Sequence, residues 1–150
     1  MIENHIPADI DAEFVQQYRK LNEDVQLDHI EIKSDKRQGQ TPMICVHGMF
    51  DSRLSFKQIC EKEDVLAKRD CYLVGTRNHA FSDHHDDMYY TAMADDIIRF
   101  ADKQGLDTFT LMGHSMGGKI VMTAACLYPD RVNGVIALDA APWNWNRFLS

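Results

Sequence analysis

The segment with the clearest capacity for chemistry is Gly113-His114-Ser115-Met116-Gly117, which has the pattern G-x-S-x-G. A serine in this pattern becomes a nucleophile when a tight strand-to-helix turn pushes its hydroxyl into the open. The flanking positions must then be glycine, because side chains there would collide with the neighbouring strand and helix. Residues 109–112 have strand character and residues 119–127 have helix character. The sequence therefore predicts a nucleophilic Ser115; the alternative is a glycine-rich turn with an idle serine.

Backbone amides near this serine could stabilise an acyl oxyanion. The Met116 N–H lies at the predicted N-terminus of a helix and is the first candidate. A second amide should come from the loop after the first parallel strand, where the sequence reads His47-Gly48-Met49-Phe50. The N–H of Met49 is the candidate there. We interpret His47 as a residue that organises this loop and does not transfer protons.

The elements that must position these groups alternate from residue 43 onward. Continuous apolar runs, typical of strands buried on both faces, cover residues 43–46, 71–74, 108–112 and 132–138. Helical patterns cover residues 52–69, 90–104 and 116–128. This alternation predicts a mostly parallel sheet with helices on both faces.

Two helix faces can be assigned from spacing. For the 52–69 helix we expect an apolar face of Leu54, Ile59, Val65 and Leu66. For the 90–104 helix we expect an inward face of Met93, Ile97, Ile98 and Ala101. Its charged residues should point largely outward as an ordinary hydrated surface, and they are Asp95, Asp96, Arg99 and Asp102. Gly105 suits a C-terminal cap of this helix.

The N-terminal part of the chain has a different character. Residues 1–26 are predicted to be a helical extension, with one apolar face made by Ile10, Phe14, Tyr18 and Leu21. Residues 27–33 alternate weakly and predict a strand. The second unit then runs from residue 27 to 150.

Four motifs together resemble the N-terminal half of an α/β-hydrolase. They are His47-Gly48-Met49-Phe50, Arg77-Asn78-His79, the segment 113–119 and Leu138-Asp139-Ala140-Ala141-Pro142. The chain is most similar to a small esterase and thioesterase-like subfamily of bacteria and mitochondria, from about Pro42 to Pro142. The resemblance implies a partial α/β-hydrolase domain, truncated after the sixth strand, with the order 2-4-3-5-6 for the strands present.

The resemblance also implies the acid of the catalytic triad. In that subfamily the acid follows the sixth strand, 24 residues after the serine, and this position is Asp139. Sequence alone marks Asp139 only as a carboxylate at the C-terminal end of a parallel strand. Two positions depart from the subfamily: Ala80 and Asp51 stand where it usually has glycine, so the loop geometry is expected to differ there.

The triad histidine has no counterpart in the chain. In this fold it follows the acid in chain order, and none of the seven histidines occupies that position; they are His5, His29, His47, His79, His84, His85 and His114. Without a base, a serine hydroxyl is a weak nucleophile at neutral pH. We therefore expect the chain to be inactive alone.

Three hypotheses follow from the missing base. The first is an ester or thioester hydrolase completed by a second polypeptide, and the second is a non-catalytic structural subunit of a larger, possibly mitochondrial, complex. The third is a fragment of a longer enzyme. Strand 132–138 would be an open apolar edge, and a protein partner is expected to cover it together with an aromatic tail of Trp143, Trp145 and Phe148.

Composition narrows the other classes. The formal net charge of −7, with no basic run, argues against nucleic-acid binding. No apolar run reaches the length of a membrane span, and the four cysteines suit a reducing, intracellular location in the cytoplasm or the mitochondrial matrix. The run His84-His85-Asp86-Asp87 lacks metal-ligand spacing, so neither a metal site nor a cofactor is predicted.

Overall fold

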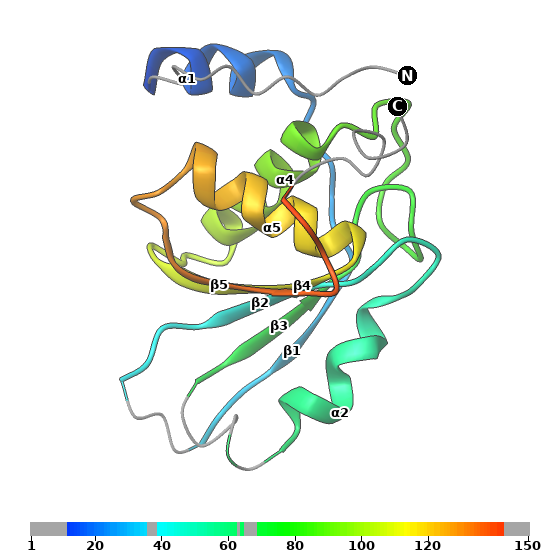
Figure 1. Ribbon diagram of the computed structural model, residues 1–150, viewed down its shortest axis with the longest axis vertical. Coiled ribbons are helices and arrows are strands. Elements are labelled where there is room, and N and C mark those ends of the chain that lie inside the picture. Colours follow the sequence, from blue (N-terminus) through cyan, green and yellow to red (C-terminus); the bar gives the residue numbers. More distant parts are fainter. Residues whose placement is uncertain (1–11, 36–38, 63, 65–68, 143–150) are drawn as a thin grey trace.

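The computed structural model describes residues 12–35, 39–62, 64 and 69–142. Its sheet has the order β1-β3-β2-β4-β5, and only β1 runs antiparallel to its neighbour (Figure 1). The strands are β1 (His29–Ile32), β2 (Met43–Val46), β3 (Cys71–Val74), β4 (Phe109–His114) and β5 (Val132–Leu138). With β1 counted as the second strand of the fold, this is the predicted order 2-4-3-5-6. The prediction of a mostly parallel sheet is thus confirmed.

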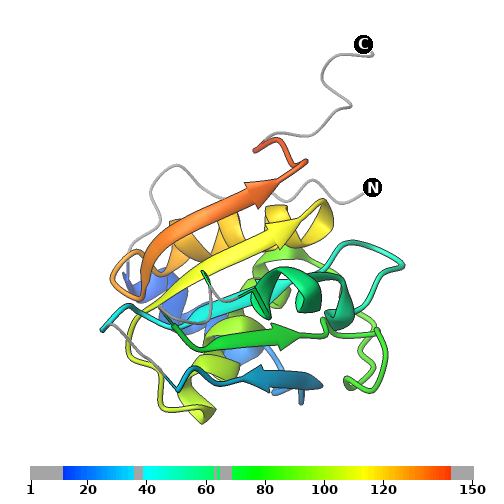
Figure 2. The ribbon, with the colours of Figure 1, turned by 90° about the horizontal axis from the view of Figure 1, so that it is seen from below.

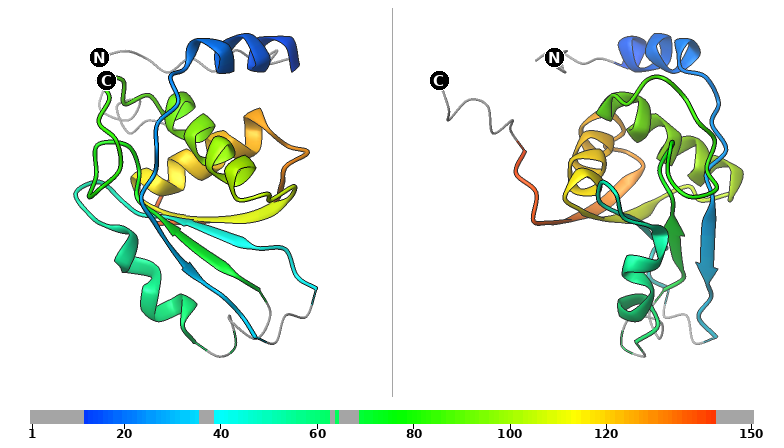
Figure 3. Two further views of the ribbon diagram at one scale, coloured as in Figure 1. Left: turned by 180° about the vertical axis from the view of Figure 1, so that it is seen from behind. Right: turned by 90° about the vertical axis from the view of Figure 1, so that its right-hand side faces the viewer.

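Helices cover both faces of the sheet, as predicted. Helices α4 (Tyr90–Lys103) and α5 (Met116–Leu127) pack on one face, and the short α2 (Lys57–Cys60) packs on the other (Figure 1). Helix α1 (Ala12–Leu21) lies over α4 on the side away from the sheet in both views of Figure 3. Gly105 ends α4 with a φ of +69°, which is the predicted glycine cap.

Strand β2 shows how one short sequence serves both faces. Its side chains alternate, so Ile44 and Val46 enter the larger core beneath α4 and α5. Met43 and Cys45 point the other way, into a smaller core with Phe56. Burial on both faces explains why the strand reads as an unbroken apolar run.

The predicted 52–69 helix is present as two short pieces over residues 53–60, and its predicted apolar face is wrong over the described residues. A 3-10 turn, η1 (Arg53–Phe56), leads into α2, which gives way to a turn after Cys60. Phe56 and Cys60, four residues apart, are the buried pair, whereas Leu54 and Ile59 are 52% and 43% exposed. The tighter 3-10 turn shifts which side chains face the sheet. Val65 and Leu66 lie outside the described residues.

Helix α4 follows its predicted bounds closely, but part of its charged face is buried. The four residues expected inward are buried. Asp95 and Asp96, expected outward, are 0% and 2% exposed. The N-terminal segment and the loop after β3 cover this side of α4 and bring arginine partners to both carboxylates.

The N-terminal segment is joined to the domain by more than a linker. Val25 is buried, the Asp83 N–H donates to the Gln26 carbonyl oxygen at 3.0 Å, and the Gln26 N–H donates to the Asp83 carboxylate at 2.9 Å. The Asp28 carbonyl accepts a hydrogen bond from the Gly75 N–H at 2.8 Å. Helix α1 lies within residues 1–26, where a helix was expected, whereas Ile10 and the side chains of Phe14, Tyr18 and Leu21 lie outside the described residues.

Strand β5 forms one edge of the sheet. Figure 2 shows it beyond β4, and β4 is its only neighbour in the described part of the chain. Val135, Ile136 and Leu138 are exposed apolar side chains on this strand. Within the described residues β5 is thus an open edge, as expected, while Trp143, Trp145 and Phe148 lie outside those residues. Across the described ranges, no helix combines the length and apolar character needed to cross a membrane.

Candidate active site

Ser115 occupies a strained turn between β4 and α5. Its backbone has φ 51° and ψ −114°, a conformation that residues with a side chain rarely adopt. A Cβ on Gly113 would lie 2.2 Å from the Gly117 carbonyl oxygen, and one on Gly117 would lie 2.1 Å from the Val46 carbonyl oxygen. Both flanking positions are thus restricted to glycine, for the steric reason that the motif predicts.

The loop after β2 lies directly beside Ser115. A Cβ built on Gly48 would be 3.4 Å from the Ser115 Cβ and 3.0 Å from the His114 Nδ1. Met49 follows Gly48, and Met116 follows Ser115 as the first residue of α5. Gly48 and Ser115 thus lie close together, and the two candidate oxyanion donors, the N–H groups of Met49 and Met116, belong to the residues that follow them.

His47 is fully buried at the end of β2 and holds two loops together. Its Nδ1 lies 2.7 Å from the Gly48 carbonyl oxygen, and its Nε2 lies 3.1 Å from the Thr76 backbone nitrogen. The ring packs edge-on against His79, with 4.9 Å between centroids. Burial lowers the pKa of His47, which favours the neutral imidazole. These contacts agree with the interpretation of His47 as a loop-organising residue.

Asp139 lies next to the serine turn through the pairing of β4 with β5. Leu138 pairs with His114, and the Ser115 N–H donates to the Leu138 carbonyl oxygen at 2.9 Å. Asp139 is the next residue, with a φ of 48° and an exposed side chain. Among the described residues its carboxylate forms no hydrogen bond or ion pair. Four candidate site residues thus follow the C-terminal ends of neighbouring parallel strands: Ser115, Met116, Met49 and Asp139.

The described histidines do not include a base in contact with the serine. His47 and His79 are engaged with each other, His29 packs against Phe100, and His85 lies in the loop after β3. His114 adjoins Ser115 but faces Gly48. No described histidine is hydrogen-bonded to the Ser115 side chain, and His5 lies outside the described residues.

Backbone strain gathers at this edge of the sheet. The five described non-glycine residues with positive φ all follow the C-terminal ends of parallel strands; they are Phe50, Asn78, Ala80, Ser115 and Asp139. Parallel α/β sheets place their ligand sites at this edge, and strain clusters at functional sites. Ala80 has a φ of 50°, so the glycine of the subfamily would be relaxed there. Asp51 is not in the left-handed region; its carboxylate accepts hydrogen bonds from Ser52 and Ser55.

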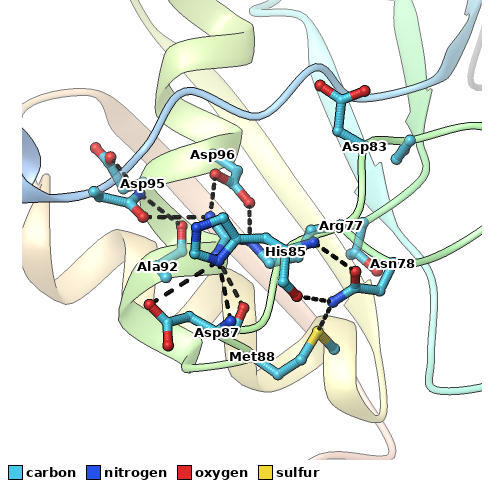
Figure 4. A network of polar contacts seen from close by, with 12 residues as sticks. Arg77, Asn78, Asp83, His85, Asp87, Met88, Ala92, Asp95 and Asp96 are labelled. Atoms are coloured by element: carbon cyan, nitrogen blue, oxygen red, sulfur yellow. Dashed lines mark hydrogen bonds and ion pairs between the residues drawn. The ribbon is translucent and has the colours of Figure 1, made fainter.

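A buried ionic network anchors the loop that contacts His47, and spacing alone did not predict it. Arg77 donates two hydrogen bonds of 2.7 Å to Asp96, with both side chains essentially unexposed. Figure 4 shows this pair beside Asp87, whose carbonyl oxygen accepts a third bond from Arg77 at 2.9 Å. Burial raises the pKa of Asp96, and the bonds from Arg77 offset part of that rise.

The second carboxylate of this network, Asp95, binds groups from three parts of the chain. It accepts hydrogen bonds from Arg99, Asn22 and Tyr128, each at 2.8 Å. The signal that could have indicated the network is Arg77, three residues after the end of β3, which the sequence assigns only to a loop motif. The residues that the structure describes hold no cluster of three or more side chains suited to a metal ion.

These features, a strained serine at the strand-to-helix turn of a mostly parallel sheet, are those of the α/β-hydrolase class. The chain belongs to the alpha/beta hydrolase fold family, whose profile matches residues 41–149. The chain is 34% identical to esterase YbfF of Escherichia coli over 120 residues, which cover 78% of the chain and 46% of that protein. It is 35% identical to the sn-1-specific diacylglycerol lipase ABHD11 of Xenopus tropicalis over 101 residues, which cover 67% of the chain and 32% of that protein.

Solved structures agree with this assignment. The chain superposes on a marine microorganism esterase with a TM-score of 0.73 and 33% identity, covering 81% of the chain and 44% of the esterase. An epoxide hydrolase A from Mycobacterium thermoresistibile gives a TM-score of 0.69 and 26% identity, over 79% of the chain and 37% of that protein. The chain thus spans less than half the length of these relatives.

Proposed function

We propose that the chain carries the nucleophile half of a serine hydrolase that cleaves carboxylic esters or thioesters. The Ser115 Oγ attacks the acyl carbonyl carbon, and the N–H groups of Met116 and Met49 stabilise the resulting oxyanion. The serine proton passes to a histidine imidazole and then to the leaving alcohol or thiol. Water then hydrolyses the acyl-serine, and the Asp139 carboxylate orients the imidazole throughout.

The observation that carries this proposal is the conformation of Ser115. A positive φ on a non-glycine residue is costly, roughly 1–3 kcal/mol, and is retained here together with glycines whose replacement the neighbouring backbone forbids. An idle serine in a glycine-rich turn has no need of this strain. The relatives support the substrate class, since they include an esterase and a diacylglycerol lipase.

This mechanism needs a general base, and we propose that the base lies outside the 150 residues. The exposed carboxylate of Asp139 has room for a hydrogen-bonded imidazole, and the exposed edge of β5 adjoins it. We propose that a polypeptide segment adds to this edge and contributes the histidine, either from a second protein or from a longer form of the same protein. The chain alone is then expected to be inactive.

The apolar edge of β5 also favours a second candidate function. Val135, Ile136 and Leu138 could serve as a docking strand in a non-catalytic structural subunit of a larger complex. Under either function we place the protein inside the cell, in the cytoplasm or the mitochondrial matrix. A partner that covers β5 is common to both, so only the serine chemistry separates them.

Labelling with a fluorophosphonate probe separates the two functions. The purified chain should label weakly, and the chain in its native complex should label strongly at Ser115, with Ser115→Ala as the unlabelled control. Asp139→Asn should lower labelling in the complex, because the imidazole loses its orienting partner. Strong labelling of the isolated chain would contradict the absence of a base. No labelling in the complex would favour the structural subunit.

A further inference from the structure

The oxyanion loop contains a peptide unit whose two ends have different roles. The Gly48 carbonyl and the Met49 N–H belong to the same amide plane, which is trans, as are all described peptide bonds. In a trans unit the carbonyl oxygen and the amide hydrogen point in opposite directions. Whatever holds the Gly48 oxygen therefore also sets the direction of the Met49 N–H.

His47 holds that oxygen. Its Nδ1 lies 2.7 Å from the Gly48 carbonyl oxygen, which also accepts a longer bond from the Asp51 N–H at 3.3 Å. A carbonyl oxygen can only accept a hydrogen bond, so Nδ1 must carry the hydrogen. The ring is fully buried, which leaves no water to compete for this bond.

The other ring nitrogen fixes the same tautomer independently. The Thr76 backbone N–H can only donate, and it lies 3.1 Å from the His47 Nε2, which must therefore be unprotonated. The two partners are a pure acceptor on one side and a pure donor on the other. Together they select the neutral Nδ1–H form and leave the ring a single orientation.

The Thr76 side of this arrangement is anchored in the helical layer. Arg77, the next residue, is tied to Asp96 of α4 by the two buried bonds described above. The turn closes with the His79 N–H donating to the Thr76 carbonyl oxygen at 3.1 Å, and the His79 ring packs on His47. Thr76 is therefore held in place by the contacts of the residues that follow it.

We propose that His47 is a positioning residue, which aims the Met49 N–H at the oxyanion by gripping the carbonyl of the same peptide unit. This inference rests on the proposed function of Met49 as an oxyanion donor. The peptide lies beside the nucleophile, since a Cβ on Gly48 would be 3.4 Å from the Ser115 Cβ. A chain of contacts runs from Asp96 through Arg77, Thr76 and His47 to the loop after β2. Helix α4 thereby helps to fix the orientation of the Gly48–Met49 peptide.

A matched pair of variants separates the grip from general packing. In His47→Asn, the side-chain Nδ2–H occupies nearly the place of the histidine Nδ1–H and can still hold the Gly48 oxygen. In His47→Gln, the side-chain amide occupies the place of Nε2. It can accept the hydrogen bond from the Thr76 N–H but cannot donate to the Gly48 carbonyl oxygen. Both variants remove an imidazole and install a neutral amide, so their packing losses are similar.

The kinetic readout uses the enzyme in its native complex with a simple ester. His47→Gln should lower kcat by about 100-fold with little change in KM, the size expected when an oxyanion donor is misdirected. His47→Asn should retain most of kcat. Equal losses in the two variants at matched melting temperatures would overturn the proposal.

A spectroscopic readout keeps the inference distinct from the proposed function. The imidazole ¹⁵N shifts of His47 should report the Nδ1–H tautomer, and the Met49 amide resonance should move in His47→Gln and stay in place in His47→Asn. An Nε2–H tautomer, or an unmoved Met49 amide in both variants, would overturn the inference. A protein that passes these tests but does not label at Ser115 would instead refute the proposed function.

Discussion

Strands β2 and β5 both end at the candidate site, yet they prepare it to different degrees. β2 is buried on both faces, and the loop that follows it is held by His47 and, through Thr76, by the Arg77–Asp96 pair. β5 is paired on one side only, carries exposed apolar side chains, and ends in an Asp139 whose carboxylate has no described partner. The contrast shows that the loop after β2 is fixed by contacts within the described residues, whereas Asp139 has no such contacts; under the proposed function, the triad acid is the part that a covering segment would complete.

The largest expected effect comes from breaking the anchor on the β2 side. Asp96→Ala should lower the free energy of unfolding by about 3–5 kcal/mol, because it removes the buried carboxylate that balances the charge of the Arg77 guanidinium. Urea unfolding measures this loss, with the exposed Asp86→Ala as the control. The double variant Arg77→Met/Asp96→Leu should recover most of the loss, since no buried charge is left. A loss below 1 kcal/mol for Asp96→Ala would contradict the anchoring role.

A pair of isoleucines compares the two strands directly. Ile44 on β2 is unexposed, and Ile136 on β5 is 41% exposed. Ile44→Ala should cost about 2–5 kcal/mol, whereas Ile136→Ala should cost less than about 1 kcal/mol in the isolated chain. In the native complex the cost of Ile136→Ala should rise, because a covering segment buries that side chain. An unchanged cost upon assembly would show that β5 is not the docking edge.

Sequence reasoning succeeded where a local pattern decides the structure. The runs at 43–46, 71–74 and 132–138 match the observed strands, and the bounds of α4 and α5 follow their periodicity. The glycine positions around Ser115 were predictable because the steric limits of that turn are local. Asp139 was expected as the acid only from the family resemblance; the structure places this residue beside the serine turn, and its role stays a prediction.

The failures have two causes, tertiary burial and a local change of helix type. Asp95 and Asp96 read as an outward face, but two other parts of the chain fold against α4 and bury them. They are the N-terminal segment, where Asn22 lies 73 residues before Asp95, and the loop after β3, where Arg77 lies 19 residues before Asp96. Leu54 and Ile59 were assigned inward from an α-helical period that the 3-10 turn does not follow. The grip of His47 on the Gly48 carbonyl depends on the meeting of two loops, which no periodicity reports.

The pH dependence of stability tests the neutral state of His47. Burial lowers its pKa in the folded protein, with Gly48 and Asp51 acting in the opposite direction and His79 in the same direction. The imidazole therefore binds its proton at a higher pH in the unfolded chain than in the folded protein. As the pH falls below about 6.5, the free energy of unfolding decreases until the pKa of the folded state is reached. The slope from this residue is at most about 1.4 kcal/mol per pH unit.

The variant His47→Gln isolates this contribution. The difference in unfolding free energy between the two proteins should shrink as the pH is lowered from 7 to 5, because only the parent chain loses the contribution of His47. Chemical denaturation at each pH measures it, and the other six histidines cancel in the difference. A difference that does not vary with pH would mean that His47 is not held neutral by the fold.

The smallest expected effect concerns backbone strain at Ala80, in the loop after β3. Ala80 has a φ of 50°, and Ala80→Gly should raise the free energy of unfolding by roughly 0.5–1 kcal/mol, since glycine adopts this conformation without steric cost. The gain is partly offset by the greater freedom of glycine in the unfolded chain. Gly105→Ala, also at positive φ but in open space at the end of α4, is the opposite change and should destabilise by a similar amount. If Ala80→Gly instead lowered the free energy of unfolding, the strain would belong to the whole loop after β3 and not to Ala80 alone.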